Sequence, residues 1–205
     1  MANVRREVLK IGDALAVDFA NTVSPEGDGA GGLGSWSDLI GFLELRGAVS
    51  RREARELRAM AERDARRCAA ALDRGRQLRE TIRSMLGAMA ARRSLLAPWV
   101  AEINQTLAWG AGAGRLVRQG SGWQLGFTAD LGEPLRALAP IARSMADLVT
   151  AGRGAEIRRC ANPRCAFYFR DRSRTRRRRW CSMAVCGNRM KVAAHARRHG
   201  RRAPR

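Results

Sequence analysis

The sequence predicts an α+β protein with a mostly helical N-terminal α/β domain, containing a small sheet, over residues 1–152. A small, strongly basic C-terminal module is predicted over residues 153–205. Three observations lead to this prediction. Apolar residues recur at helical spacing through most of the first 150 residues, one hairpin pattern interrupts them, and four of the five cysteines cluster near the C-terminus. A chain of 205 residues is long enough for one core plus a small appended module.

Segment 15–23 opens the predicted N-terminal domain. Its apolar and polar residues alternate, which predicts a short β-strand. Asp18 and Asn21 lie beside the end of this strand, where such residues often cap a turn. They are also the candidate polar groups of a small-ligand or enzymatic site, although no paired carboxylates, nucleophile–base set or phosphate loop accompanies them. Residues 24–34 are rich in glycine and predict a flexible connection.

Two serines mark predicted helix starts. Ser35 precedes Asp38, and Ser50 precedes Glu53, each at the spacing of a capping box. A glycine at position 47 is expected to end the first of these helices. Beyond the second box, apolar residues recur on one helical face, namely Leu57, Met60, Ala61, Ala65, Cys68, Leu72, Leu78, Ile82, Met85, Leu86 and Met89.

The remainder of the N-terminal domain combines helices with one hairpin. Residues 98–109 are predicted to form a helix. Residues 115–118 and 123–128 flank a glycine-containing turn and predict two antiparallel strands. Helical periodicity returns over residues 133–151, where Pro140 is expected to kink or split the helix.

Positive charge is concentrated at the C-terminal end of the chain. The whole chain has 39 Lys and Arg against 19 Asp and Glu, a net charge of +20. Residues 151–205 contain 18 of the basic residues and two acids, so this part carries +16 and the first 150 residues carry only +4. Such an asymmetry predicts a polyanionic partner: nucleic acid, an anionic membrane or an acidic protein.

The sequence predicts a cytoplasmic protein. We find no signal-peptide pattern and no stretch of about 20 apolar residues that could span a bilayer, so no membrane partner is expected. Thiols stay reduced in the cytoplasm, where clustered cysteines more often bind metal than form disulfides.

One of the five cysteines lies in the N-terminal domain, and the other four lie close together near the C-terminus. Cys68 lies on the apolar helical face and is interpreted as a small buried core residue rather than a reactive or metal-binding one. Two C-x4-C pairs separated by 15 residues predict one structural tetrahedral zinc ion. The expected ligands are Cys160, Cys165, Cys181 and Cys186.

Two alternatives to this ligand set remain. The four cysteines could form two disulfides or stay free, although a reducing compartment disfavours disulfides. A different set would combine the second cysteine pair with His195 and His199, which are four residues apart on a predicted helix. This choice would leave Cys160 and Cys165 without a metal.

Around these cysteines the sequence resembles the CGNR zinc finger. The resemblance rests on Cys160-Ala-Asn-Pro-Arg-Cys165, on the aromatic-rich residues 167–171, and on Cys186-Gly-Asn-Arg189, which gives that finger its name. Segment 15–23 is similar to the opening of the ABATE domain, which commonly precedes this finger in bacterial proteins. The resemblance implies a treble-clef-like zinc finger, an α/β N-terminal domain and a role in transcriptional regulation under stress.

The candidate nucleic-acid contacts lie in a loop and in the last helix. Seven of the ten residues 170–179 are arginines, whose planar guanidinium groups suit phosphate. A helix is predicted after Cys186 with one basic stripe, and Asn188 and Arg189 in its first turn either contact base edges or brace the zinc site. The candidate contacts are Arg174, Arg176, Arg177, Arg178, Arg179, Asn188, Arg189, Lys191, His195, Arg198 and Arg202.

These features favour a DNA-binding transcriptional regulator that is not an enzyme. An RNA-binding, zinc-ribbon-like protein is the alternative, because Phe167, Tyr168 and Phe169 could stack on bases instead of forming a small core. A zinc-stapled module for an acidic protein partner is another alternative. The N-terminal domain is expected to respond to an effector or to mediate assembly, and the sequence leaves the oligomeric state open.

Overall fold

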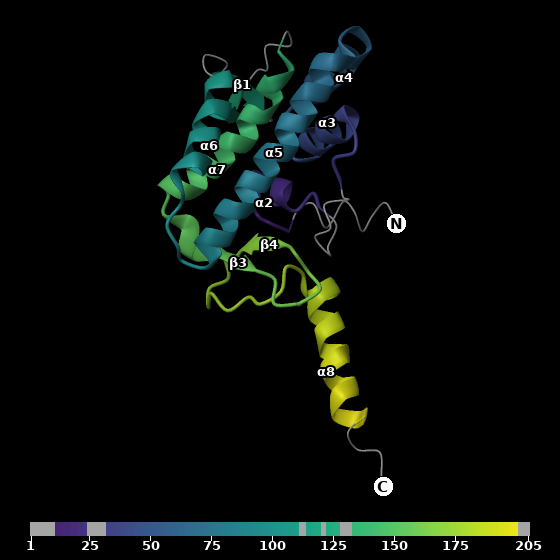
Figure 1. The fold of residues 1–205 in the computed structure, drawn as a ribbon, viewed down its shortest axis with the longest axis vertical. Coiled ribbons are helices and arrows are strands. Elements are labelled where there is room, and N and C mark those ends of the chain that lie inside the picture. Colours follow the sequence, from purple (N-terminus) through teal and green to yellow (C-terminus); the bar gives the residue numbers. More distant parts are fainter. Residues whose placement is uncertain (1–10, 24–31, 111–113, 120–121, 128–132, 201–205) are drawn as a thin grey trace.

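The computed structural model describes residues 11–23, 32–110, 114–119, 122–127 and 133–200. It has the predicted α+β class: a helical domain with a small hairpin, followed by a finger-like C-terminal region (Figure 1). The helical domain contains α2 (Leu15–Ala20), α3 (Trp36–Leu45), α4 (Arg51–Arg63), α5 (Ala65–Ala90), α6 (Ala97–Trp109), β1 (Gly114–Gln119), β2 (Gly122–Phe127), η1 (Pro134–Leu138) and α7 (Ala139–Thr150).

The first predicted strand is wrong, because residues 15–20 form helix α2. This helix packs between α5 and α7, and the backbone N–H of Ala16 donates to Ser144 Oγ at 3.1 Å. Val17 and Phe19 are buried, but so are Ala16 and Ala20. A short helix that is buried on nearly every side has no polar face, so its apolar pattern does not reveal the helical period.

Both predicted capping boxes are confirmed. Ser35 and Asp38 exchange hydrogen bonds at the start of α3, and Ser50 and Glu53 do the same at the start of α4. The long apolar face that follows spans two helices rather than one. They divide at Asp64, whose side chain accepts a hydrogen bond from the backbone of Arg67 and caps α5.

The later helices and the hairpin also follow the predicted order. Helix α6 has Pro98 in its first turn, as a helix start tolerates. Strands β1 and β2 pair antiparallel, with Leu116 opposite Leu125, while the two turn residues at 120–121 lie outside the described residues. Before Pro140 the chain forms the 3₁₀ helix η1, and α7 begins at Ala139, so the proline splits the predicted helix.

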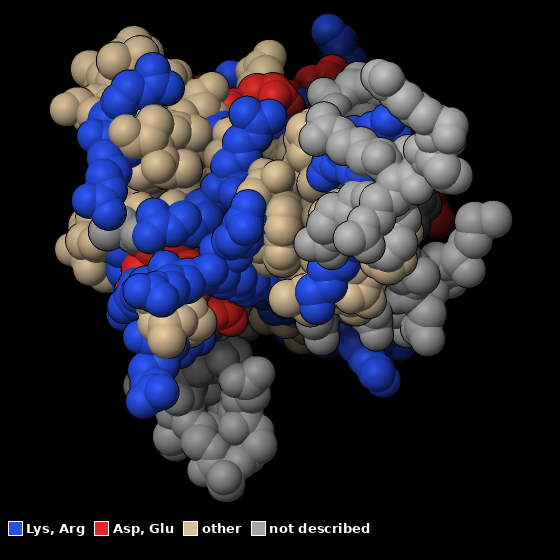
Figure 2. Space-filling model, turned by 90° about the horizontal axis from the view of Figure 1, so that it is seen from below, with Lys and Arg blue, Asp and Glu red and all other residues tan. Residues whose placement is uncertain are grey.

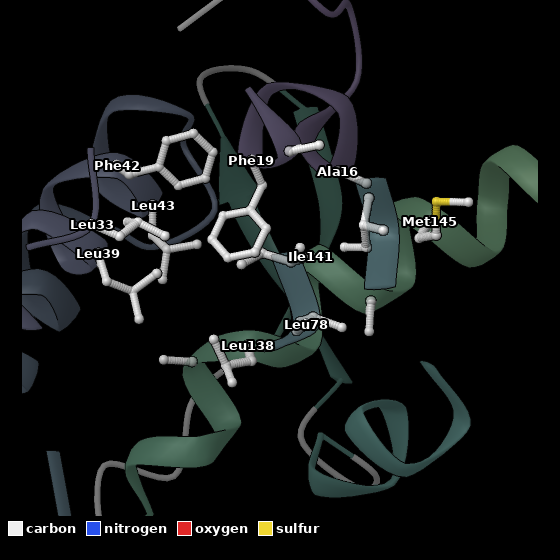
Figure 3. Close-up of a cluster of buried hydrophobic side chains, with 14 of the residues drawn as sticks. Ala16, Phe19, Leu33, Leu39, Phe42, Leu43, Leu78, Leu138, Ile141 and Met145 are labelled. Carbon is white, nitrogen blue, oxygen red and sulfur yellow. The ribbon is translucent and has the colours of Figure 1, made fainter. Parts of the chain in front are cut away.

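Helix α5 runs through the centre of the helical domain. Figure 3 shows Phe19 from α2 pointing toward Leu78 of α5 and Ile141 of α7. Cys68 is 1 % exposed in this core, as predicted. None of the helices in the described part of the chain is long and apolar enough to cross a membrane.

The C-terminal region is a small hairpin followed by a helix. Strands β3 and β4 pair antiparallel, and Arg158 lies opposite Phe169. Figure 1 shows the last helix projecting away from the helical domain. The elements of this region are η2 (Arg153–Glu156), β3 (Ile157–Arg159), β4 (Tyr168–Arg170), the π-helical turn η3 (Met183–Gly187) and α8 (Asn188–Gly200).

Candidate zinc centre and basic surface

The fold brings the four predicted cysteine ligands together. Cys160 directly follows β3, and Cys165 lies before β4 in the turn between the two strands. Cys181 ends the long loop after β4, and Cys186 lies in η3, which leads directly into α8. All four are buried, and their Sγ atoms lie within 4.8 Å of one another.

The sulfur positions fit a tetrahedral zinc ion. Zn–S bonds of about 2.3 Å in a tetrahedron place the sulfurs about 3.8 Å apart. The Sγ of Cys181 lies 3.8 Å from that of Cys165 and 3.6 Å from that of Cys186. A disulfide would bring two sulfurs to about 2.05 Å, and all five cysteines are free thiols. The donor set therefore fits one structural zinc ion and not a pair of disulfides.

The histidine alternative finds no support in this geometry. Among the described residues, the cluster of possible metal ligands at this site consists of cysteines alone. His195 is exposed on α8, and the side chain of His199 lies outside the described residues.

The hydrogen bonds among the closely packed thiols shift their pKa values in opposite directions. Hydrogen bonds from Cys165 and Cys181 lower the pKa of Cys160 to about 2. The hydrogen bond with Cys160 raises the pKa of Cys165 to about 12, and those with Cys160 and Cys165 raise the pKa of Cys181. Zinc binds cysteine as thiolate, so a bound ion takes the place of the retained protons.

Asn162 is a residue of this site that the sequence did not reveal. Its side chain is 2 % exposed, and its Nδ2 donates to Cys186 Sγ at 3.4 Å. Its Oδ1 accepts from the backbone N–H of Arg164 at 3.1 Å, which shapes the turn between the first two cysteines. Asn162 thus links the first cysteine pair to the second. An asparagine at such a turn is the only signal in the sequence, and it does not predict the contact with sulfur.

The motif glycine has a steric role. A Cβ atom on Gly187 would clash with Met183 Sδ and would lie 3.1 Å from Trp180 Cδ1, so the missing side chain lets these two side chains lie against the glycine. The next two motif residues, Asn188 and Arg189, are exposed. Their exposure favours a contact with an external partner over a bracing role at the zinc site.

One arginine of the predicted phosphate-binding loop is held inside the finger. Arg178 donates from Nε to the carbonyl of Trp180 at 3.0 Å and also donates to the carbonyl of Cys181. Its guanidinium group lies 4.4 Å from the centre of the Phe169 ring. These contacts position the segment that carries a zinc ligand, so the predicted phosphate contact by Arg178 finds no support in the structure.

Acidic side chains hold other parts of the same loop. Arg170 and Arg176 both pair with Glu156, the latter at 3.0 Å, and the hydrogen bond from Arg170 lowers the pKa of that carboxyl group. The fully buried Asp171 accepts hydrogen bonds from Ser173 and from the backbone N–H of Arg178. Burial alone would raise the pKa of Asp171, but these hydrogen bonds lower it on balance. The loop therefore has a fixed inner edge.

The remaining predicted contacts face solvent where they are described. Arg179 is exposed and lies over the ring of Trp180, with 5.1 Å between its guanidinium carbon and the ring centre. The side chain of Arg198 and the whole of Arg202 lie outside the described residues. Figure 2 shows this end of the molecule, where Lys and Arg side chains form a connected band. The exposed candidates are Arg174, Arg176, Arg177, Arg179, Asn188, Arg189, Lys191 and His195.

The two polar residues near the N-terminus serve internal contacts. Asp18 is fully buried, pairs with Arg46 at 2.7 Å and accepts from the backbone N–H of Gly12 at 2.7 Å. Asn21 is 1 % exposed, and its amide group bonds to the backbone of Tyr168 in the finger. These contacts account for both residues without a bound small molecule.

The fold and the site together define a helical domain joined to a four-cysteine zinc finger, with zinc in a structural role. Residues 156–199 match the model of the CGNR zinc finger. Residues 13–152 match the model of the ABATE family, described as "Putative stress-induced transcription regulator". Because this match covers more than half of the chain, the protein belongs to the ABATE family. No curated protein matches the chain.

Proposed function

We propose that this protein binds DNA through its zinc finger and regulates transcription, acting by binding rather than by catalysis. The observation that carries this proposal is the charge of the finger surface. After Asp171 the sequence contains no acidic residue, while 13 arginine and lysine residues follow. Glu156 already pairs with Arg170 and Arg176, and Asp13 pairs with Arg172, so the exposed arginines outnumber the acidic side chains near them.

The shape of the finger supports duplex DNA as the partner. Helix α8 is anchored at one end by Cys186 and extends away from the helical domain (Figure 1). Exposed Arg189, Lys191 and Arg197 lie along it. A helix of this kind fits the major groove, where asparagine and arginine side chains recognise base edges. The exposed Asn188 and Arg189 at its start are therefore the proposed base contacts.

The packing of the aromatic residues favours DNA over RNA. Phe167 is 3 % exposed and Phe169 is fully buried, so both belong to the finger core. Tyr168 is partly buried and packs against Arg83 of the helical domain. These three residues are thus unsuited to the base stacking on which the RNA alternative depends.

The family description supports the regulatory part of this proposal. It names a stress-induced transcription regulator, and we propose a stress-linked role for this protein on that basis. We further propose that it acts in the cytoplasm, where reduced thiols keep the zinc site intact. An effector of the helical domain would then modulate binding by the finger.

A salt titration with matched variants tests DNA binding. We would measure binding to a fluorescent duplex and to a single-stranded RNA of the same sequence. The parent protein should bind the duplex more tightly, with a log–log salt slope of about −0.9 for each phosphate contacted. Replacing Arg174, Arg177 and Arg179 by alanine should weaken binding to every sequence and flatten that slope. Arg178 is left in place because its loss would disturb the zinc site.

The matched control removes the same charge from the helical domain. Arg51, Arg55 and Arg66 are exposed on α4 and α5, and their replacement by alanine should leave the salt slope unchanged. Zinc content should stay at one ion per chain in both variants. Equal binding of the parent and the loop variant to both nucleic acids would overturn the proposal and favour an acidic protein partner. Tighter binding to RNA would favour the RNA alternative.

A single substitution tests the proposed base contacts. Arg189→Ala should relax preference at one position of the bound sequence by roughly 1–3 kcal/mol while zinc stays bound. Loss of zinc affinity together with uniform weakening on all sequences would instead show that Arg189 braces the zinc site.

A further inference from the structure

We propose that α2 and its flanking residues clamp the zinc finger, so that zinc binding and the folding of α2 are coupled. Asn21 is the principal positioning residue of this clamp. The inference concerns the chain's own packing and holds whichever polyanion the finger binds.

Asn21 closes the open edge of the finger hairpin. On one edge, β4 pairs with β3, where Tyr168 lies opposite Arg159. On the other edge, Asn21 Nδ2 donates to the carbonyl of Tyr168 at 2.7 Å, and Asn21 Oδ1 accepts from its N–H at 2.9 Å. One side-chain amide thus supplies both hydrogen bonds that a neighbouring strand would supply.

A second backbone contact lies two residues further along β4. The N–H of Arg170 donates to the carbonyl of Gly12 at 3.3 Å. The N–H of Gly12 in turn donates to the buried carboxylate of Asp18 in α2, and this carboxylate pairs with Arg46. The outer edge of β4 is therefore held at both of its ends by residues that flank or belong to α2.

Arg83 connects the finger to the end of α2 from a third direction. Its guanidinium group donates to the carbonyl of Ala20 at 2.7 Å and to the carbonyl of Ala166 at 3.2 Å. It also lies 5.7 Å from the centre of the Tyr168 ring. The side chain is only 17 % exposed, so these contacts are largely shielded from water. Arg83 of α5 thus adds a further link between the helical domain and the finger.

The apolar core of the finger is completed by the N-terminal segment. Val23, just after α2, is 7 % exposed and belongs to the same buried cluster as the four cysteines and two phenylalanines of the finger. Ile11, which precedes α2 in the sequence, also packs against this cluster. Within the described residues, the finger core is therefore built from both ends of the sequence.

This arrangement makes the coupling reciprocal. If α2 stabilises the zinc-bound form of the finger, zinc must stabilise the clamped form of α2 by the same free energy. Loss of the ion would release the cysteines and with them the cluster that covers Val23. Loss of the Asn21 amide would leave the partly buried N–H and carbonyl of Tyr168 without these partners, which weakens the clamped form.

Zinc transfer to a coloured chelator tests the clamp in the full-length protein. Asn21→Leu keeps the side-chain volume nearly constant and removes both hydrogen bonds. We expect zinc to leave this variant about tenfold faster than the parent. The matched control is Asn104→Leu on the exposed surface of α6, which should release zinc at the parent rate. A parent-like release rate in a folded Asn21→Leu variant would overturn the proposal.

Hydrogen exchange provides a second test that needs no variant. Removal of zinc from the parent protein should accelerate backbone exchange in residues 15–22 while exchange in α6 stays unchanged. A merely structural role of Asn21 would not make α2 respond to the metal. Unchanged exchange over residues 15–22 after zinc removal would overturn the coupling, even if the Asn21→Leu variant failed to fold. Neither measurement involves nucleic acid, so failure of the DNA-binding proposal would leave this one standing.

Discussion

Helix α5 and the zinc site stand at the centres of two differently stabilised regions. Around α5, large apolar side chains from α2, α3, η1 and α7 form a continuous buried cluster (Figure 3). Among the described residues, the buried cluster of the finger consists of its four cysteines and two phenylalanines, together with Val23 from the N-terminal segment. Such a small cluster buries little apolar surface, so the finger depends on its metal, whereas the helical domain depends on packing.

The comparison also shows where the two regions meet. The helical domain contributes Asn21, Arg83 and Val23 to the finger, so the finger is not held by zinc alone. Removal of the metal and removal of packing should therefore have effects of different size and in different places.

Loss of a zinc ligand should have the largest effect. Structural zinc contributes roughly 10–16 kcal/mol of apparent binding free energy in small fingers. We expect Cys181→Ser to lose the ion and unfold the finger, while α5, α6 and α7 stay helical. Elemental analysis and far-UV circular dichroism would measure both outcomes. One retained zinc ion per chain in this variant would show that the ligand set is wrong.

A cavity in the helical core should have the next largest effect. Ile82 is fully buried on α5, and Ile82→Ala should lower the free energy of unfolding by about 2–5 kcal/mol. Denaturant titration would measure this change, with zinc content unchanged under native conditions. Val149→Ala on the exposed surface of α7 is the matched control and should shift stability by less than about 0.5 kcal/mol. Equal effects of the two substitutions would contradict the proposed core.

The affinity for zinc should fall as the pH is lowered. In the metal-free site, the hydrogen bond with Cys160 raises the pKa of Cys165 to about 12, so this thiol keeps its proton at neutral pH. The metal-free form then binds more protons than the zinc form, and raising the pH favours the zinc form. We expect zinc affinity to rise about tenfold per pH unit for each proton displaced. Competition titrations at pH 6, 7 and 8 would measure this slope, and a flat profile would contradict it.

Cys68→Ala should have the smallest effect. Burial raises the pKa of the Cys68 thiol, which lies in the helical core, so it stays protonated and unreactive. The substitution should cost on the order of 1 kcal/mol through lost packing and leave one zinc ion per chain. Denaturant unfolding and elemental analysis would measure both. Loss of zinc from this variant would show that Cys68 takes part in metal binding and would contradict its assignment as a core residue.

The sequence by itself determined the features that depend on neighbouring residues. The capping boxes at Ser35 and Ser50 form because each serine bonds to a backbone N–H three residues away. The cysteine spacing predicted the ligand set, because each C-x4-C pair places two sulfurs close together through one short turn, and the fold brings the two pairs together. The apolar face of α5 was readable because a long helix repeats its period many times.

The tertiary structure decided what depends on residues far apart in the chain. Segment 15–20 forms a helix that α5 and α7 bury on nearly all sides. It therefore has no exposed polar face, and its sequence lacks the alternation of apolar and polar residues from which a helix is predicted. The side chain of Asn21 forms hydrogen bonds with Tyr168, which is 147 residues away in the sequence, and Asn162 bonds to Cys186, which is 24 residues away. The sequence showed that the loop is basic, but only its contacts separate Arg178, bound to two carbonyls, from the exposed Arg174. A hydrogen bond between distant segments leaves no periodic trace in the sequence, because its geometry exists only after both segments have packed.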